Sequence, residues 1–295
     1  MQDRQEEIAG VRLTHPEREL YPGVGLTKWD LARYYNQVGQ RILPHLEGRA
    51  LTLVRCPSGI EQGCFYQKHE SKGLPPSVGT VSIQEKNGSG TYLFIKDLTG
   101  LLSLVQMDTL EFHPWGARHD RLERPDRMIF DLDPGPELNL SEVSGAALAV
   151  RDLLAELELQ SFARLTGGKG IHVVVPLLRN HDWDQVKAFA KGVAERLAQA
   201  EPERYTTNPR KSERQGRIFV DYLRNSRGAT SVASYSSRAR AGAPLAWPVS
   251  WAELESGNSS TRTVADILDQ DLPEDPWRDF FSLRQGLKKK ARESL

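Results

Sequence analysis

Two aspartates one residue apart, at the end of an apolar run, are the residues of this chain best suited to chemistry. The stretch PDRMIFDLDPGP, residues 125–136, contains Asp131 and Asp133 and is ended by a Pro-Gly-Pro turn. Residues two apart on a β-strand face the same side, so both carboxylates would face one cavity. Carboxylates this close repel each other unless a cation lies between them, and their oxygens suit Mg²⁺ or Mn²⁺. The alternative is a strand end whose aspartates face water.

A third carboxylate has a similar setting. Asp221 lies within the strand-like run RIFVDYL, residues 217–223, among apolar and aromatic neighbours. Burying a carboxylate there is costly unless it is paired or bound to a metal. We therefore expect Asp221 to be the third metal ligand.

A glycine-rich hairpin is predicted at residues 162–177, FARLTGGKGIHVVVPL. Its glycines would let the backbone approach a phosphate closely, and Thr166, Lys169 and His172 add a hydroxyl, a cation and an imidazole. It is not a Walker loop, because it lacks G-x₄-G-K-[ST] and leads into a strand. A hairpin without a ligand is the alternative.

The charge of the chain is balanced in total but uneven along the sequence. The 295 residues carry 39 Lys and Arg and 39 Asp and Glu, but residues 204–240 hold nine cations against two carboxylates. Such a basic segment can bind phosphates, although it can also be an ordinary solvated face. No apolar run is long enough to span a membrane, and the polar N-terminus lacks a signal-peptide core, so we expect a cytoplasmic protein without a membrane partner.

The two cysteines, Cys56 and Cys64, are predicted to be buried or loop thiols. Two cysteines in a chain of this length do not make a disulfide framework, and C-x₇-C is not a usual zinc spacing. Completion of a metal site by His45 or His69 is the alternative.

The elements that would hold these residues are mixed. Thr27 and Asp30 predict a capping box for a helix from Lys28 to about residue 42, ending before Pro44. Lys28 in its first turn would be explained by a phosphate partner, or would be an ordinary surface lysine. Further helices are expected at 142–158, where Ser141 would be the cap, at 182–200, and in short pieces near 250–256, 261–270 and 277–285.

Strands are expected on both sides of these helices. Residues 50–70 predict a hairpin whose second arm carries Phe65, Lys68 and His69, a mixture that suits stacking on bases beside phosphates, or a core aromatic beside solvated cations. Residues 71–90 are expected to be loop and turn. The fold class is therefore α+β (mixed α/β), with sheets flanked by helices. Without a repeat or a clear linker, we expect one catalytic domain over 1–295.

Taken together, FDLDPGP, TGGKGIH and FVDYLRN…YSSRAR, with ELYP…TK, RCPSGIEQGCFYQKH and FHPWG before them, resemble one family. It is the polymerase domain of bacterial ATP-dependent DNA ligase D, which belongs to the archaeo-eukaryotic primase superfamily. The motifs occur in the family's order over about residues 10–285.

The resemblance implies roles for individual residues. Asp131, Asp133 and Asp221 resemble the family's catalytic metal ligands. Further positions resemble contacts to the nucleotide triphosphate or supports of the active site: Thr166 (where the family usually has Ser), Lys169, His172, Arg238 and Arg240, with His113 and Arg214 beside them. Lys28 resembles the lysine that grips a downstream 5′-phosphate, and Phe65 the aromatic that stacks on the template, with Lys68 as a further DNA contact.

The same resemblance implies the reaction and the partners. Two Mn²⁺ or Mg²⁺ ions would support transfer of a nucleotide from an NTP or dNTP to a primer, with a preference for ribonucleotides and Mn²⁺. The DNA partner would be an end or a gap bearing a 5′-phosphate, and a Ku-like protein and a DNA ligase domain would work alongside.

Other functions remain to be weighed. A phosphohydrolase of the haloacid dehalogenase type shares a D-x-D stretch but needs D-x-D-x-[TV], whereas Gly135 follows Pro134 here. A non-catalytic DNA-end bridging module would use Phe65, Lys28 and the basic segment and would tolerate loss of the aspartates. A primase that starts strands de novo is a variant of the leading hypothesis.

Overall fold

The chain alternates between two structural units, so each unit is assembled from segments far apart in the sequence. The computed structural model describes residues 6–295. One unit contains the described residues up to Trp115 together with Thr230–Ala246 and Arg262–Pro273, and the other contains Gly116–Ala229, Trp247–Thr261 and Glu274–Leu295. Because the chain changes unit several times, no single linker in the sequence marks a boundary. Both units combine helices and sheets, which confirms the mixed fold class.

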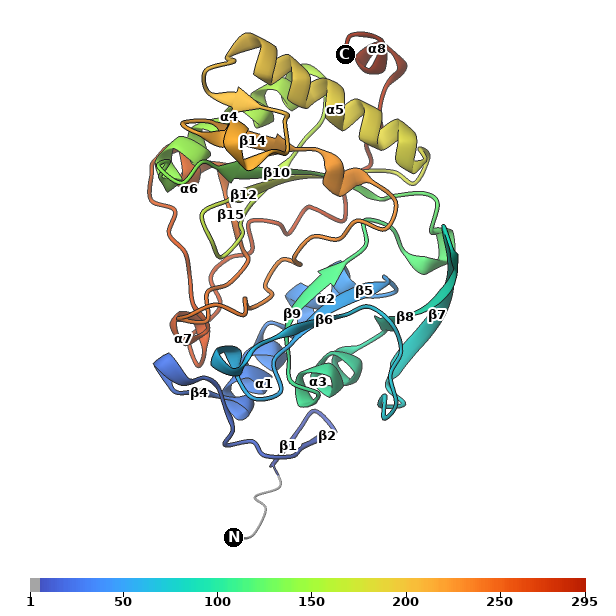
Figure 1. The fold of residues 1–295 in the computed structure, drawn as a ribbon, viewed down its shortest axis with the longest axis vertical. Coiled ribbons are helices and arrows are strands. Elements are labelled where there is room, and N and C mark those ends of the chain that lie inside the picture. Colours follow the sequence, from blue (N-terminus) through green and yellow to red (C-terminus); the bar gives the residue numbers. More distant parts are fainter. Residues whose placement is uncertain (1–5) are drawn as a thin grey trace. The chain divides into compact units, whose positions relative to one another are not determined.

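The first unit is organised around a sheet in which β6, β5, β8 and β7 follow in that order and β9 also pairs with β5. Helices α1 and α3 pack against each other, and α3 also contacts β7 and β9 (Figure 1). The strands of this unit are β1 (Glu6–Ile8), β2 (Val11–Leu13), β3 (Glu19–Tyr21), β4 (Leu26–Thr27), β5 (Leu51–Arg55), β6 (Phe65–Gln67), β7 (Val78–Glu85), β8 (Gly88–Ile95) and β9 (Thr109–Pro114). Its helices are α1 (Lys28–Gln37), α2 (Gly39–Leu46), α3 (Leu98–Gln106) and α7 (Val264–Ile267).

The start of α1 confirms the predicted capping box, in which Thr27 and Asp30 satisfy each other's backbone N–H groups. Its end differs from the prediction. The helix breaks at Val38, and α2 then continues through Pro44 to Leu46. The break places Pro44 in a short second helix, where its missing N–H removes a single bond to the preceding turn. Residues 78–85, expected to be loop, form β7.

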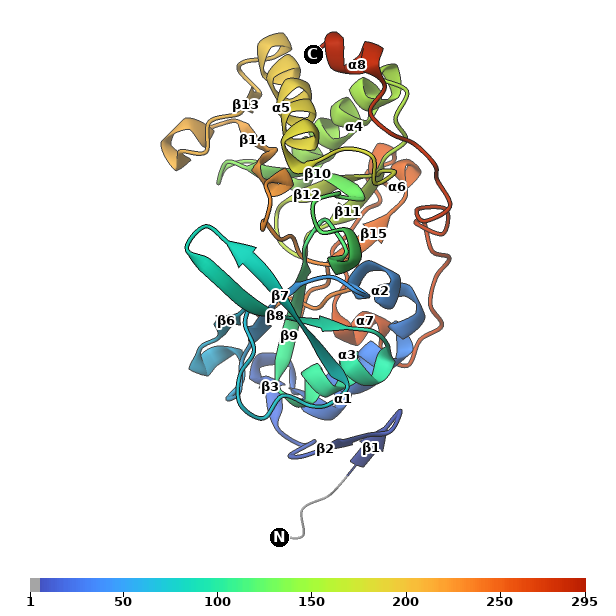
Figure 2. The same cartoon turned by 90° about the vertical axis from the view of Figure 1, so that its right-hand side faces the viewer.

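The second unit contains a six-stranded sheet in the order β13-β14-β10-β12-β11-β15. Helices α4 and α5 lie side by side on one face of it, over β12, β10 and β13 (Figures 1 and 2). The strands are β10 (Arg127–Pro134), β11 (Phe162–Leu165), β12 (Ile171–Pro176), β13 (Tyr205–Thr206), β14 (Ile218–Asp221) and β15 (Trp247–Val249). The helices are α4 (Leu140–Glu156), α5 (Trp183–Ala200), α6 (Trp251–Glu255) and α8 (Lys289–Glu293).

The C-terminal segment of this unit supplies core residues that the predicted helices did not foresee. Trp277 and Phe280 stack at 4.9 Å and pack with Ile129 of β10 and Val174 of β12. Residues 277–285 form no helix, contrary to the prediction. Packing of these two rings on the sheet is compatible with an irregular turn, because tertiary burial can outweigh weak helix propensity.

Helix α4 begins two residues earlier than predicted. Asn139, rather than Ser141, is its N-cap, and Asn139 forms a capping box with Glu142. Ser141 lies in the first turn of the helix. Ser and Asn are both favoured as N-caps, so the sequence alone offered two candidates. Helix α5 begins one residue later than predicted, at Trp183, because Asp182 is its N-cap and forms a capping box with Gln185.

The prediction of two thiols is wrong. Cys56 and Cys64 form a disulfide, with their Cα atoms 4.3 Å apart. Strands β5 and β6 are antiparallel, and Arg55 pairs with Phe65. Cys56, which follows Arg55, therefore lies opposite Cys64, which precedes Phe65. This pairing depends on strand register, which the spacing of the cysteines in the sequence did not provide.

Within residues 6–295, none of the helices has the length and apolar character needed to cross a membrane.

Candidate active site

The three aspartates predicted to act together lie on two neighbouring strands of the second unit. Strands β10 and β14 are antiparallel, and their register places Asp131 directly opposite Asp221. Asp133 lies two residues further along β10, on the same side of the strand as Asp131. The side chains of Asp131 and Asp221 are 8% and 10% exposed, whereas that of Asp133 is 39% exposed. Asp133 is therefore the carboxylate most accessible to a ligand.

Arg224 bridges the two more buried carboxylates. Its Nε lies 3.0 Å from Oδ2 of Asp131 and 3.4 Å from Oδ2 of Asp221. The short 3₁₀ turn Leu223–Asn225 carries it, and the buried Asn225 holds this turn by bonding to both backbone groups of Ile129. The side chain of Arg224 is thus directed at the aspartates by backbone contacts one residue away.

A second chain of contacts reaches Asp131 from the glycine-rich hairpin. Arg164 of β11 pairs in register with His172 of β12, and its Nη2 lies 2.6 Å from Nδ1 of His172. A guanidinium can only donate, so Nδ1 is the acceptor and the ring proton is on Nε2. That Nε2 lies 3.1 Å from Oδ1 of Asp131 and donates to it. Burial lowers the pKa of His172, against the attraction of Asp131, and keeps the ring neutral in this tautomer.

The pKa values of the aspartates are driven apart. Burial opposes ionisation of Asp131, but His172 and Arg224 outweigh it and hold its pKa well below the usual range. Burial and then the charge of Asp131 raise the pKa of Asp133 to about 6. Burial likewise raises the pKa of Asp221, although Arg224 opposes the shift. Arg214 lies beside Asp133 and Arg224 beside Asp221, but for these two carboxylates the nearby positive charge does not outweigh burial.

The chemistry of this donor set fits a divalent cation. Among residues 6–295, no three His, Cys, Asp or Glu side chains are already gathered as a metal cluster. Asp131, Asp133 and Asp221 nevertheless offer hard oxygen ligands on adjoining strands, and the raised pKa values of two of them would fall beside a cation. These three are the residues that would hold Mn²⁺ or Mg²⁺, and this stays a prediction.

The turn of the glycine-rich hairpin approaches β10 closely. A Cβ atom on Gly170 would lie 2.9 Å from the carbonyl oxygen of Leu132, closer than real side chains come. The hydroxyl of Thr166 is directed inward and donates to the carbonyl of Gly170. Lys169 is exposed, and its Nζ donates to the carbonyl of Pro136. Lys169 is therefore the exposed cation of the hairpin, held close to the end of β10 by this bond.

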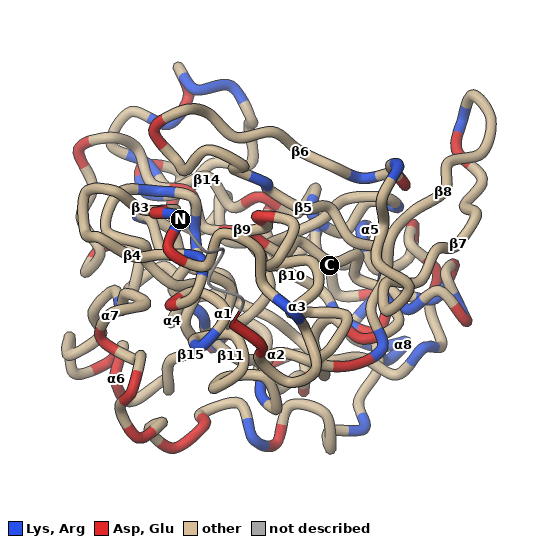
Figure 3. The backbone as a smooth tube through the Cα atoms, turned by 90° about the horizontal axis from the view of Figure 1, so that it is seen from below, with Lys and Arg blue, Asp and Glu red and all other residues tan. Residues whose placement is uncertain are grey.

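The basic segment 204–240 is less positive in space than in sequence. It divides between the two units, and six of its cations pair with carboxylates: Arg204, Arg214, Arg217, Arg224, Arg227 and Arg238. Lys and Arg are interspersed with Asp and Glu along the chain (Figure 3). Arg214 lies 3.4 Å from Asp133 and stacks over Phe219 at 4.3 Å, so it supports the aspartate site.

The first unit gathers the other predicted nucleotide contacts around a carboxylate. Glu111 of β9 accepts from Nε2 of His113 at 2.7 Å and from Nε of Arg238 at 3.0 Å. Its other oxygen accepts from the backbone N–H of Ala239 at 2.7 Å. Burial opposes ionisation, but these partners lower the pKa of Glu111 to about 2. Arg240 is exposed on the same segment.

The predicted DNA contacts also lie in the first unit. Lys28 is no ordinary surface lysine: it is 2% exposed, and its Nζ lies 2.6 Å from Asp108. Arg18 also contacts Asp108, at 3.3 Å. Burial lowers the pKa of Lys28, with Asp108 opposing the shift. Phe65 is 47% exposed, and the Arg55 guanidinium lies 5.4 Å from the centre of its ring.

Comparisons with known proteins agree with the motifs. A family model of the LigD primase-polymerase domain matches residues 27–277. The chain belongs to this family. It is 40% identical over 291 residues to the multifunctional non-homologous end joining protein LigD of Pseudomonas aeruginosa, covering 97% of this chain and 35% of that protein. It is 37% identical over 253 residues to the multifunctional non-homologous end joining DNA repair protein LigD of Mycobacterium tuberculosis, covering 83% and 33%.

A solved structure gives the same result for the fold. The polymerase domain of Mycobacterium tuberculosis ligase D in complex with DNA matches with a TM-score of 0.83 and 34% sequence identity, over 88% of this chain and 93% of that one. This LigD primase-polymerase domain is thus a nucleotidyltransferase. The chain spans about a third of the length of the curated relatives named above.

Three residues that hold predicted functional residues in place, two in the second unit and one in the first, were not themselves among the predictions. Arg224 follows Asp221 by three, a spacing that one 3₁₀ turn brings to the same side. Arg164 lies opposite His172 once the hairpin is paired, and Glu111 lies two before His113 on a strand. Pairing of the two hairpin strands would have indicated Arg164, and the alternation of side chains along one strand would have indicated Glu111.

Proposed function

We propose that this chain catalyses template-directed transfer of nucleotides to DNA, filling gaps and extending ends in bacterial double-strand-break repair. The observation that carries the proposal is the register of β10 and β14, which places Asp131 opposite Asp221 with Asp133 beside them. Two of the relatives are named as non-homologous end joining proteins, and the matching solved structure is a polymerase domain with DNA.

The residues of the chain prepare the site for this reaction. Divalent cations, when bound, would activate the primer 3′-hydroxyl and stabilise charge on the transferring phosphoryl group and on pyrophosphate. His172 and Arg224 fix both oxygens of Asp131, so this carboxylate stays ionised and keeps one orientation. Asp133 is more exposed and is the carboxylate that must lose its proton before it can act as a ligand.

The proposed triphosphate contacts are divided between the units: Thr166 and Lys169 lie on the glycine-rich hairpin of the second unit, and His113, Arg238 and Arg240 lie in the first. Lys169 and Arg240 are exposed cations, and Thr166 would add a hydroxyl. Arg238 and His113 would contact the nucleotide while Glu111, which accepts a hydrogen bond from each, holds them in position. Both ring nitrogens of His172 are engaged, so we assign it the positioning of Asp131, and the expected triphosphate contact would require it to release one of these partners. A preference for ribonucleotides is part of the proposal.

The downstream strand would be held in the first unit. Lys28 and Arg18 both contact Asp108, so two cations share one carboxylate and leave positive charge for a 5′-phosphate. Phe65 offers an exposed ring for stacking on the template, with Lys68 exposed three residues later. A Ku-like end-binding protein and a DNA ligase domain are the partners that the repair role requires.

Primer extension on a one-nucleotide gapped duplex tests the proposal. We expect templated addition with Mn²⁺, greater with ribonucleotides, and greater when the downstream strand carries a 5′-phosphate. Asp131→Asn should abolish addition, whereas Asp271→Asn, an exposed aspartate of the first unit, should not. Addition that persists in the Asp131 variant would refute the assigned site.

The proposed contact between Lys28 and a 5′-phosphate is tested by comparing two gapped duplexes. Lys28→Gln should weaken binding to the 5′-phosphorylated gap and leave binding to the 5′-hydroxyl gap nearly unchanged. Lys187→Gln, a partly exposed lysine of α5, is the matched control. Equal losses on the two duplexes would show that Lys28 supports the fold rather than the phosphate.

A further inference from the structure

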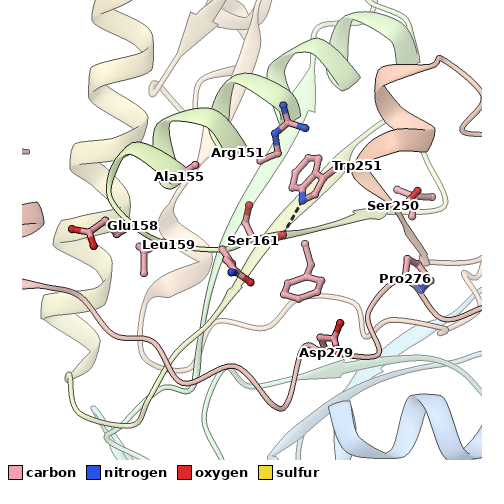
Figure 4. Close-up of a pocket in the computed structure, with 12 residues that line it drawn as sticks. Arg151, Ala155, Glu158, Leu159, Ser161, Ser250, Trp251, Pro276 and Asp279 are labelled. Atoms are coloured by element: carbon pink, nitrogen blue, oxygen red, sulfur yellow. Dashed lines mark hydrogen bonds between the residues drawn. The ribbon is translucent and has the colours of Figure 1, made fainter.

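A cavity of about 620 Å³ lies in the second unit and contains none of the residues assigned to nucleotidyl transfer (Figure 4). Helix α4, the segment leading into β11, the start of α6 and the C-terminal segment each contribute to its wall. Its apolar lining includes Leu159, Phe162, Val249 and Trp251. A volume of this size accommodates a ligand or a few side chains.

The cavity contains a buried hydroxyl with no partner. Ser161 is 8% exposed and its Oγ makes no hydrogen bond, although it lines the cavity. The backbone carbonyl of the same residue is already satisfied by Nε1 of Trp251 at 2.8 Å (Figure 4). A buried hydroxyl without a partner costs free energy, so a group that reaches this one after a small movement of the side chains around it would gain a hydrogen bond.

The charges around the cavity favour a cationic occupant. Arg151 is held by Asp152 and Glu255, and it lies over the ring of Trp251 at 5.4 Å. Glu158 pairs with Lys288, and Asp279 has Arg278 at 3.7 Å. With Glu274, which pairs with Arg278, and Lys290, whose charge also acts on Glu158, this set contains five carboxylates and four cations. Among the residues that line the cavity, two are carboxylates and one is a cation, and that cation, Arg151, is already paired with acidic partners, so the cavity is a poor site for a nucleotide or phosphate.

We propose that this cavity docks a basic peptide segment of a partner protein. An apolar side chain of the segment enters beside Trp251 and Phe162, a polar group bonds to Ser161, and a neighbouring Lys or Arg meets Asp279. The charges are spread over α4, α6 and the C-terminal segment, which suits an extended peptide with more than one cation better than a small amine. Trp251 and Phe162 are partly exposed, and aromatic residues in a pocket are typical of the residues that dominate an interface.

The test uses the full chain labelled with 5-fluorotryptophan, in the absence of DNA and nucleotide, so that it does not depend on the proposed reaction. The Trp251 resonance is assigned with Trp251→Phe, and the probe is the capped tripeptide acetyl-Lys-Phe-Arg-amide. We expect a saturable shift of the Trp251 signal that weakens as salt is added. Acetyl-Glu-Phe-Glu-amide and acetyl-Lys-Gly-Arg-amide, which lack the charge or the anchor, should each bind at least tenfold more weakly.

Two conservative variants examine the assigned contacts. Ser161→Ala and Asp279→Asn should each lower the affinity for the tripeptide about fivefold, as expected for the loss of one hydrogen bond or one exposed ion pair. Ser141→Ala and Asp271→Asn are the controls at exposed positions, and they should leave the affinity unchanged. No Trp251 shift at millimolar probe, equal binding of the acidic tripeptide, or full affinity in both cavity variants would overturn the proposal. Phenethylamine that binds as tightly as the tripeptide would also overturn it, in favour of a small-amine site.

Discussion

Glu111 offers the most direct link between a buried charge and the arrangement of the nucleotide contacts. It is 5% exposed and accepts from His113, Arg238 and the backbone of Ala239. We expect Glu111→Gln to lower the free energy of unfolding at neutral pH. A fall in pKa from 4.5 to about 2 corresponds to about 3 kcal/mol of stabilisation by the ionised form. The uncharged amide of Gln keeps the shape of the side chain but loses most of this stabilisation.

The sign of the pH dependence follows from the same pKa. The folded pKa of Glu111 lies below the unfolded one, so its contribution is complete above about pH 4.5 and is lost as the pH falls toward 2. Urea unfolding of the wild type and of Glu111→Gln is measured at pH 7, 5, 4 and 3. Trp115 lies in the same unit as Glu111, and its 5-fluorotryptophan resonance reports the relevant transition. The difference in the free energy of unfolding between the wild type and Glu111→Gln should become smaller below pH 4.5.

Function should change along with stability. Without the carboxylate, His113 and Arg238 lose their shared anchor, so the KM for the nucleotide should rise more than kcat falls. Glu61→Gln, at an exposed position, is the matched control for both measurements. A Glu111→Gln protein that loses less than about 0.5 kcal/mol, or whose deficit does not change with pH, would refute the reasoning.

Three other predictions concern the second unit and the disulfide. Because the pKa of Asp133 is raised to about 6, Mn²⁺ affinity measured by electron paramagnetic resonance should fall ~tenfold from pH 7 to pH 5, and an equal affinity at both would contradict this. Arg164→Met should reduce single-turnover addition ~tenfold and shift the His172 ring proton, seen by ¹⁵N NMR, away from Nε2; an unchanged tautomer would exclude the proposed coupling. Cys64→Ser should lower the free energy of unfolding by about 2 kcal/mol without reductant and have no effect with it, whereas a deficit that persists in reductant would point to lost packing.

The features predicted well from sequence are those that depend on local signals. The capping box at Thr27, the hairpin around the three glycines and a helix over nearly all of the predicted 182–200 are present. The errors arose where distant packing decided the outcome. Pro44 lies inside a helix because the chain breaks before it, and residues 277–285 are irregular because two aromatic rings pack on the sheet.

The site shows the same division. The spacing of Asp131 and Asp133 predicted a shared side, and the apolar surroundings of Asp221 predicted a partner, but neither could show that Asp131 and Asp221 face each other. The residues that orient the site come from strand pairing and from a turn, as with Arg164 and Arg224. The disulfide was missed for the same reason, since it depends on register rather than spacing.

The counter-charges of the aspartates explain how such a site can fold before any ligand arrives. Buried carboxylates are costly unless they are paired, and the raised pKa values of Asp133 and Asp221 show that their ionised forms oppose folding at neutral pH. The 3₁₀ turns at the two ends of β14 supply Arg214 for Asp133 and Arg224 for Asp131 and Asp221. The strand that brings the third carboxylate therefore brings two cations with it. Two guanidinium groups do not balance three carboxylates, and the negative charge that remains is what a divalent cation would neutralise.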